Sequence, residues 1–194
     1  MAAPQDTPFA CSCGKLGGVL LAVDPNQGTH AECHCTSCRC GEIYCGQPDP
    51  APDPVGIFQT SADKVRIDRG QEHLAVFSFG ETNLLRWYAD CCGSPMFNTL
   101  RNPKLGFAGV RTSCLADTAP LGPIVATGFI PTENGKQKHR GLPVMVWRTL
   151  RRMTGDRLSG RWKNGPFFDS TTLQPIRPVK IVSAEERRGL IKST

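Results

Sequence analysis

The chain has 194 residues and a formal net charge of +6 at pH 7. This length fits one domain with extensions, and 16 prolines and 20 glycines exclude a helical bundle in favour of short strands and frequent turns. No run approaches the roughly 20 apolar residues of a membrane span, and the first residues lack the basic and apolar regions of a secretory signal. We therefore expect a cytoplasmic protein that binds no membrane.

The N-terminal half alternates turn residues with short apolar runs. Residues 1–8 predict disorder, residues 16–23 predict a strand, and Asn and Gly at residues 24–28 predict a turn. Repeated prolines at residues 47–54 predict an extended loop, because proline interrupts both helices and central strands.

Four further runs, several with the two-residue alternation of half-buried strands, predict an antiparallel meander. They are residues 55–60, 64–67, 74–79 and 84–88. Residues 105–110 predict one more strand. Proline and glycine interrupt residues 120–131, so no element is predicted there.

The pattern changes to helical spacing at Pro143, and Gly155 is predicted to follow the end of this short amphipathic helix. Ser183, followed by Glu185 and Glu186, predicts a capped last helix through about Ile191. The sequence therefore predicts a mainly β domain of short antiparallel strands in residues 1–135. A basic extension with short helices, residues 136–194, is expected to pack on it.

Positive charge is concentrated near the predicted helix. Residues 136–163 contain nine Lys and Arg and one acidic residue, Asp156. Such a segment can bind an anionic small molecule or nucleic acid, or it can simply form a solvated surface. The aromatic residues in this part are irregularly spaced, which disfavours nucleic acid.

Four of the ten cysteines fall within residues 33–40. In a reducing compartment, such clustering favours metal binding over disulfides. A C-x-C step in extended backbone points both side chains to one side, and a C-x-x-C step adds a third after a turn. Cys33, Cys35 and Cys38 therefore predict a zinc site with Zn–S distances of about 2.3 Å. His34 should point away from it.

The fourth ligand at this site decides its role. Cys40 or Cys45 would close it as a structural four-cysteine site, whereas a site with three protein ligands can bind a substrate. The sequence leaves both alternatives open.

Three motifs in order carry a resemblance to a known family: Cys11-x-Cys13, Cys33-x-Cys35-x-x-Cys38, and Cys92-Gly93 after a predicted strand. Over roughly residues 10–110 the chain resembles the glutathione-dependent formaldehyde-activating enzymes. The resemblance implies a β-rich, tent-like fold with one or two Zn²⁺ ions. It assigns Cys11, Cys13 and Cys92 to a first zinc, and the Cys33 motif to a second, catalytic zinc.

The family's late motif is C-x-x-C-G, but this chain has Ala89 where the motif has its first cysteine. Cys91 could replace it only if the backbone turns sharply, because adjacent residues on a strand point oppositely. Gly93 and Pro95 permit such a turn. A site of three cysteines, or no metal there, is the alternative.

A zinc with three thiolates is a weak Lewis acid and is better suited to holding a fourth, external thiolate. This chemistry suits a small thiol such as glutathione, and the resemblance implies carbon–sulfur lyase-like activity that makes or breaks S-(hydroxymethyl)glutathione. Arg39 would either offset the negative charge or lie solvated at the surface. Because the same family includes a centromere-associated member, a non-catalytic zinc-stabilised binding or scaffolding module is the alternative.

Overall fold

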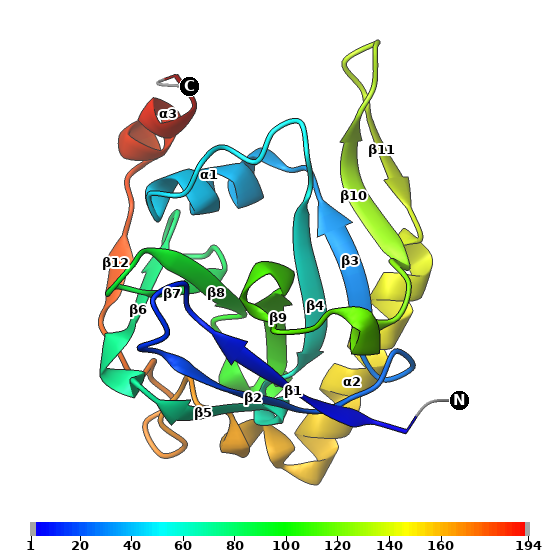
Figure 1. Cartoon of the computed structure of the whole chain (residues 1–194), viewed down its shortest axis with the longest axis vertical. Coiled ribbons are helices and arrows are strands. Elements are labelled where there is room, and N and C mark those ends of the chain that lie inside the picture. Colours follow the sequence, from blue (N-terminus) through cyan, green and yellow to red (C-terminus); the bar gives the residue numbers. More distant parts are fainter. Residues whose placement is uncertain (1–2, 193–194) are drawn as a thin grey trace.

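The computed structural model describes residues 3–192 and confirms a mainly β fold with few helices. The strands form two sheets (Figure 1). A small sheet has the order β1-β2-β5, and a large sheet has the order β11-β10-β3-β4-β9-β8-β7-β6-β12. Helix α1 lies across one end of the large sheet, and α2 lies beside β3 and β4 (Figure 1).

The strands are β1 (Gln5–Ala10), β2 (Gly17–Val23), β3 (Thr29–Cys33), β4 (Val55–Ser61), β5 (Val65–Arg69), β6 (Leu74–Ser78), β7 (Leu85–Ala89), β8 (Ser94–Thr99), β9 (Phe107–Arg111), β10 (Ala126–Pro131), β11 (Gln137–Arg140) and β12 (Val179–Ile181). The α-helices are α1 (Thr36–Tyr44), α2 (Leu142–Ser159) and α3 (Ala184–Lys192). Short 3₁₀ turns join several of them.

The predicted meander is wrong in part. Strands β6, β7, β8 and β9 are consecutive antiparallel neighbours, but β4 pairs with β3 and β9, and β5 joins β2 in the small sheet. Local alternation identifies a half-buried strand without identifying its partner, and here the partners are distant in sequence. The interrupted segment at residues 120–131 contains β10, which pairs in parallel with β3.

Disorder was predicted at the N-terminus, but β1 is a strand paired with β2. Thr7 and Phe9 on β1 are buried while Asp6 and Pro8 are exposed, so the strand places one face on the core. This alternation is short and contains Pro8, which is unusual within strands, so the sequence alone does not indicate a strand here.

Helix α2 begins with Pro143 in its first turn, as predicted, but it continues through Gly155 to Ser159, and Gly160 caps it. Gly160 has φ +73°, the left-handed conformation that terminates helices. Helix α3 has the predicted cap, because the Ser183 hydroxyl accepts a hydrogen bond from the Glu186 N–H at 3.0 Å.

The main core contains Trp87, Phe97 and Phe167, all almost fully buried between the sheets and the C-terminal segment. A second, smaller apolar cluster lies between α1 and α3 and includes Cys40 and Phe77. Within residues 3–192, no helix combines the length and apolarity needed to cross a bilayer.

Candidate metal centre

Two groups of cysteines converge in the fold. We call Cys11, Cys13, Cys91 and Cys92 the first cluster, and Cys33, Cys35 and Cys38 the second cluster. In each, the sulfur atoms lie within 4.8 Å of one another.

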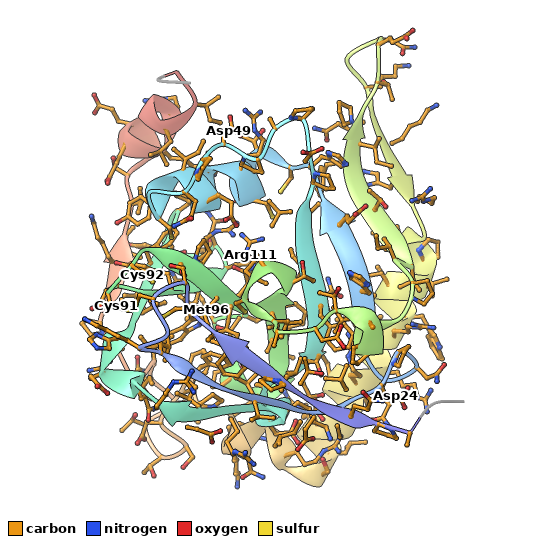
Figure 2. All side chains as sticks on the ribbon, viewed as in Figure 1. Asp24, Asp49, Cys91, Cys92, Met96 and Arg111 are labelled. Atoms are coloured by element: carbon orange, nitrogen blue, oxygen red, sulfur yellow. The ribbon has the colours of Figure 1, made fainter. Side chains whose placement is uncertain are left out.

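The first cluster joins the small sheet to the large one. Cys11 and Cys13 follow β1, and Cys91 and Cys92 lie in the turn between β7 and β8 (Figure 2). In that turn the N–H groups of Cys92 and Gly93 both donate to the Ala89 carbonyl, and Gly93 has φ +72°. The backbone therefore turns sharply enough to bring both adjacent cysteines into the cluster.

The spacing of these sulfurs fits a metal ion. The Cys11–Cys13, Cys11–Cys91 and Cys13–Cys91 separations are 3.6, 3.9 and 3.4 Å, and Cys91–Cys92 is 4.0 Å. Four sulfurs about 2.3 Å from a tetrahedral zinc lie about 3.8 Å from one another. Cys91 is therefore placed to supply the fourth sulfur, which Ala89 cannot provide.

Cys92 is surrounded by serine hydroxyls. Its sulfur lies 3.2 Å from the Ser94 Oγ, and Ser94 is hydrogen-bonded to Ser12 at 3.0 Å. Although burial raises the pKa of Cys92, hydrogen bonds from Ser12 and Ser94 outweigh it and lower the pKa to about 5. The thiolate, which is the form that binds metal, is therefore favoured at neutral pH.

Replacing Ser94 with alanine should weaken metal binding at the first cluster by about 10-fold to 100-fold, as loss of an outer hydrogen bond typically does. A lowered thiol pKa keeps Cys92 ionised as pH falls, so its return toward the ordinary value should move metal release to higher pH. Metal retention between pH 8 and pH 5, followed with a chromogenic chelator, tests this. Ser170→Ala, an exposed serine away from both clusters, is the control; identical release curves for the two variants would contradict the expectation.

The second cluster lies where β3 passes into α1. Cys33 ends β3, Cys35 caps α1, and Cys38 lies in the first turn. The Cys35 sulfur accepts the Cys38 N–H at 3.3 Å, so cysteine takes the capping role that serine or aspartate usually has. A helix N-terminus favours thiolates because its N–H groups carry partial positive charge.

Two buried arginines act on this cluster. Hydrogen bonds from Cys33 and Cys35, then the charges of Arg111 and Arg86, hold the pKa of Cys38 well below its ordinary value despite burial. Arg86 donates to Ser37 at 2.9 Å, and Gly41 leaves room for its guanidinium. Arg111 is the last residue of β9, and its side chain pairs with Glu42 of α1 at 2.9 Å (Figure 2). These cations can offset the negative charge of three thiolates.

Neither candidate for a closing fourth ligand joins the second cluster. Cys40 and Cys45 are buried in the apolar cluster beneath α3, and the Cys40 sulfur lies 3.9 Å from the Arg187 carbonyl oxygen. Among the described residues the group therefore has three cysteines. His34 also lies outside it, as predicted from its place between two ligands.

The second cluster instead borders a cavity of about 530 Å³. Its walls come from β3, β4, β7 to β11 and the starts of α1 and α2, and they are mostly apolar. The charged and titratable side chains on them, besides the cysteines, are Glu32, Arg86, His139 and Arg140. The volume lies in the range of small-molecule sites.

Arg39, predicted to offset charge at the cluster or to be solvated, is engaged elsewhere. Its Nε donates to Asp49 at 2.9 Å, and it lines a different cavity with His34 and Lys136. Asp49 lies on the loop after α1 (Figure 2). Arg86 and Arg111, rather than Arg39, lie where their charges act on Cys38.

The sequence did not identify Arg86, Arg111 or the pairing of His73 with Asp90. A signal existed for Arg86, because a single arginine interrupts an otherwise apolar and aromatic strand. His73 lies 3.4 Å from Asp90, and both lie close to Cys91 at the edge of the first cluster. Only the fold brings these residues together.

Comparisons with known proteins give a family without a known function. The model of a family of unknown function, DUF6151, matches residues 4–171. A crystal structure of a Rhodobacter sphaeroides protein, a target of the Northeast structural genomics programme, is 22% identical and has a TM-score of 0.41. That likeness covers 60% of this chain and 96% of the other. No curated protein matches.

Proposed function

The chain belongs to the DUF6151 family, and for this member of it we propose a zinc-dependent, carbon–sulfur lyase-like enzyme that acts on a thiol–aldehyde adduct. The reaction would occur in the cavity beside the second cluster. One observation carries the proposal: three converging cysteines border a cavity of small-molecule size, and no fourth cysteine among the described residues joins them.

The donor sets suit zinc at both clusters. Thiolates are soft ligands that zinc accepts, and the sulfur separations in the first cluster match a tetrahedron. The first cluster, with four cysteines, fits a structural role. When bound at the second cluster, zinc supplies a position that holds an external thiol in its thiolate form.

The cavity residues fit the rest of the reaction. The Phe129 N–H donates to His139 Nδ1 at 3.2 Å, so a neutral His139 carries its proton on Nε2. As the thiol sulfur bonds to the aldehyde carbon, the carbonyl electron pair moves to oxygen, and the Nε2–H of His139 on the cavity wall would donate a hydrogen bond to that oxygen. The proton that the thiol loses on becoming a thiolate returns through water to the same oxygen, and the reverse reaction follows the same path.

Arg140 gives the cavity a cation for an acidic thiol. It donates to the Thr127 hydroxyl at 3.3 Å and is exposed, and it forms no salt bridge within residues 3–192. A substrate carboxylate would pair with it, as arginine does with carboxylates generally. Glutathione has two carboxylates and one thiol and meets these requirements.

The test is the rate at which glutathione and formaldehyde exchange with S-(hydroxymethyl)glutathione, measured by exchange NMR against the spontaneous rate. The zinc-loaded native chain should accelerate exchange, and Cys38→Ala should not. Cys40→Ala is the matched control, because it removes a buried thiol two residues along the same helix but outside the cluster.

Cys40→Ala is also expected to keep the metal content of the native chain, since Cys40 faces the apolar cluster beneath α3. Elemental analysis checks this. Loss of one metal ion in this variant would instead support the alternative in which Cys40 is the fourth ligand of a closed site. Full metal content without acceleration in the native chain would instead favour a non-catalytic zinc-stabilised module.

A further inference from the structure

A second large cavity lies away from both clusters. It has a volume of about 730 Å³ and lies between α2 and the turn at residues 24–28; we call it the α2 groove. It shares no lining residue with the cavity at the second cluster. Strand β4 separates the two, because Ile57 and Gln59 face the cysteine cavity while Phe58 and Thr60 line the α2 groove.

The α2 groove is strongly basic. Its cationic lining residues are Lys64, Arg148, Arg151, Arg152 and Arg161, and Asp24 is the acidic residue among the lining. Arg161 is paired with Asp156 and Asp63, so the other four carry the excess charge. The Asp24 carboxylate is already engaged by the backbone N–H and side-chain amide of Asn26. Like charges three and four residues apart destabilise a helix, so α2 alone gains nothing from this arrangement.

Two of these arginines are held in place by backbone groups. Arg148 Nη1 donates to the carbonyls of Pro25 and Gly28 at 2.9 and 3.3 Å, and Arg152 Nη1 donates to Gln27 O at 2.9 Å. Neither they nor Arg151 forms a salt bridge in the described part of the chain. Arg148 and Arg152 are therefore fixed in a concave site with no carboxylate in ion-pair contact, and Asp156 is the acidic group whose charge acts on Arg152. Such an arrangement attracts anions.

Burial makes the charge at Arg152 costly. It lowers the pKa of Arg152 to about 10, so this guanidinium still carries its charge at neutral pH. Arg152 is half-buried and donates to Gln27 O and to the hydroxyls of Thr29 and Thr149, which holds the guanidinium in one orientation. A phosphate group would offset the charge and accept the forked hydrogen bonds that arginine offers.

The groove also has an aromatic surface. Trp147 lines it and is 68% exposed, which leaves an indole ring available for stacking. Phosphate-binding guanidiniums beside an exposed aromatic ring, in a cavity of this volume, match the two chemical parts of a nucleotide.

We propose that the α2 groove binds a nucleotide, with its phosphates on Arg148, Arg151 and Arg152 and its base stacked on Trp147. A compact concave site favours a single nucleotide over a strand of nucleic acid, because Arg157, on the same helix, lies outside it. The site is independent of the chemistry at the second cluster.

The experiment is titration calorimetry of the full, zinc-loaded chain with ATP, ADP, inorganic phosphate and a single-stranded oligonucleotide. We expect ATP to bind more tightly than phosphate. Arg151→Gln should weaken ATP binding about tenfold, the effect of losing one charged hydrogen bond. Trp147→Ala should weaken it at least about fivefold but leave phosphate binding unchanged.

Arg157→Gln is the matched control: the same charge is removed from an exposed position of α2 outside the groove. Equal weakening in Arg157→Gln and Arg151→Gln would overturn the site, as would no binding of ATP at about 1 mM. Binding of phosphate alone, or of the oligonucleotide alone, would overturn the assignment to a nucleotide. Metal content should stay unchanged in all three variants, which separates this result from the function proposed at the cysteines.

Discussion

Replacing Cys35 with serine is expected to remove one of two zinc ions per chain and to abolish any glutathione-linked activity. Cys35 both supplies a sulfur to the second cluster and caps α1, and serine can keep the cap while losing the soft ligand. Elemental analysis on protein purified without chelator gives the metal count. Two ions retained with activity intact would refute the assignment.

Cys92→Ser is the companion variant and should lose the other ion. It should also lower the thermal midpoint much more, because the second cluster spans only residues 33–38 whereas Cys11 and Cys91 are 80 residues apart. One ion in the native chain, lost only in Cys92→Ser, would leave the proposed reaction without its chemical basis.

Replacing Arg111 with methionine is expected to reduce the free energy of unfolding by about 3 to 5 kcal/mol, the usual cost of leaving a buried partner charge unpaired. Arg111 is 2% exposed and forms its ion pair with a largely buried Glu42. Urea denaturation followed by circular dichroism provides the measurement. The metal content should be determined alongside it, because Arg111 also acts on Cys38.

Two further variants show whether the loss of stability in Arg111→Met comes from the unpaired Glu42 carboxylate. Adding Glu42→Gln to Arg111→Met removes the orphaned carboxylate and should recover part of the loss. Arg66→Met removes an exposed arginine from an ion pair with Asp68 and should leave stability nearly unchanged, since exposed pairs contribute little. A single Arg111→Met variant as stable as Arg66→Met would contradict the expected role of the buried pair.

Short-range patterns in the sequence predicted most of the local structure. The C-x-C-x-x-C spacing led to the convergence of Cys33, Cys35 and Cys38, because a strand end followed by a helical turn is a local feature. Gly93 indicated the turn that admits Cys91. The prediction that α2 ends before Gly155 is wrong, because a glycine within a helix costs only about 1 kcal/mol and packing on the sheet stabilises α2 beyond it.

Contacts between segments distant in the sequence could not be predicted from such short patterns. The pairing of β5 with β2, the burial of Arg86 and Arg111 beside Cys38, and the exclusion of Cys40 all depend on which distant segments pack together. An arginine within an apolar strand predicts an unusual environment but does not name its partner. The α2 groove likewise needs the turn at residues 24–28, more than 100 residues before the helix, to be complete.

The first cluster ties the small sheet to the turn between β7 and β8. A metal ion bound there would hold together segments about 80 residues apart and would be released on unfolding, so it would stabilise the folded chain through its binding free energy. The fraction of folded protein should then follow the free zinc concentration, with about 1.4 kcal/mol gained for each tenfold rise above the dissociation constant. Zinc supply in the cell would therefore set the lifetime of this protein against proteases, even for a chain whose sequence is unchanged.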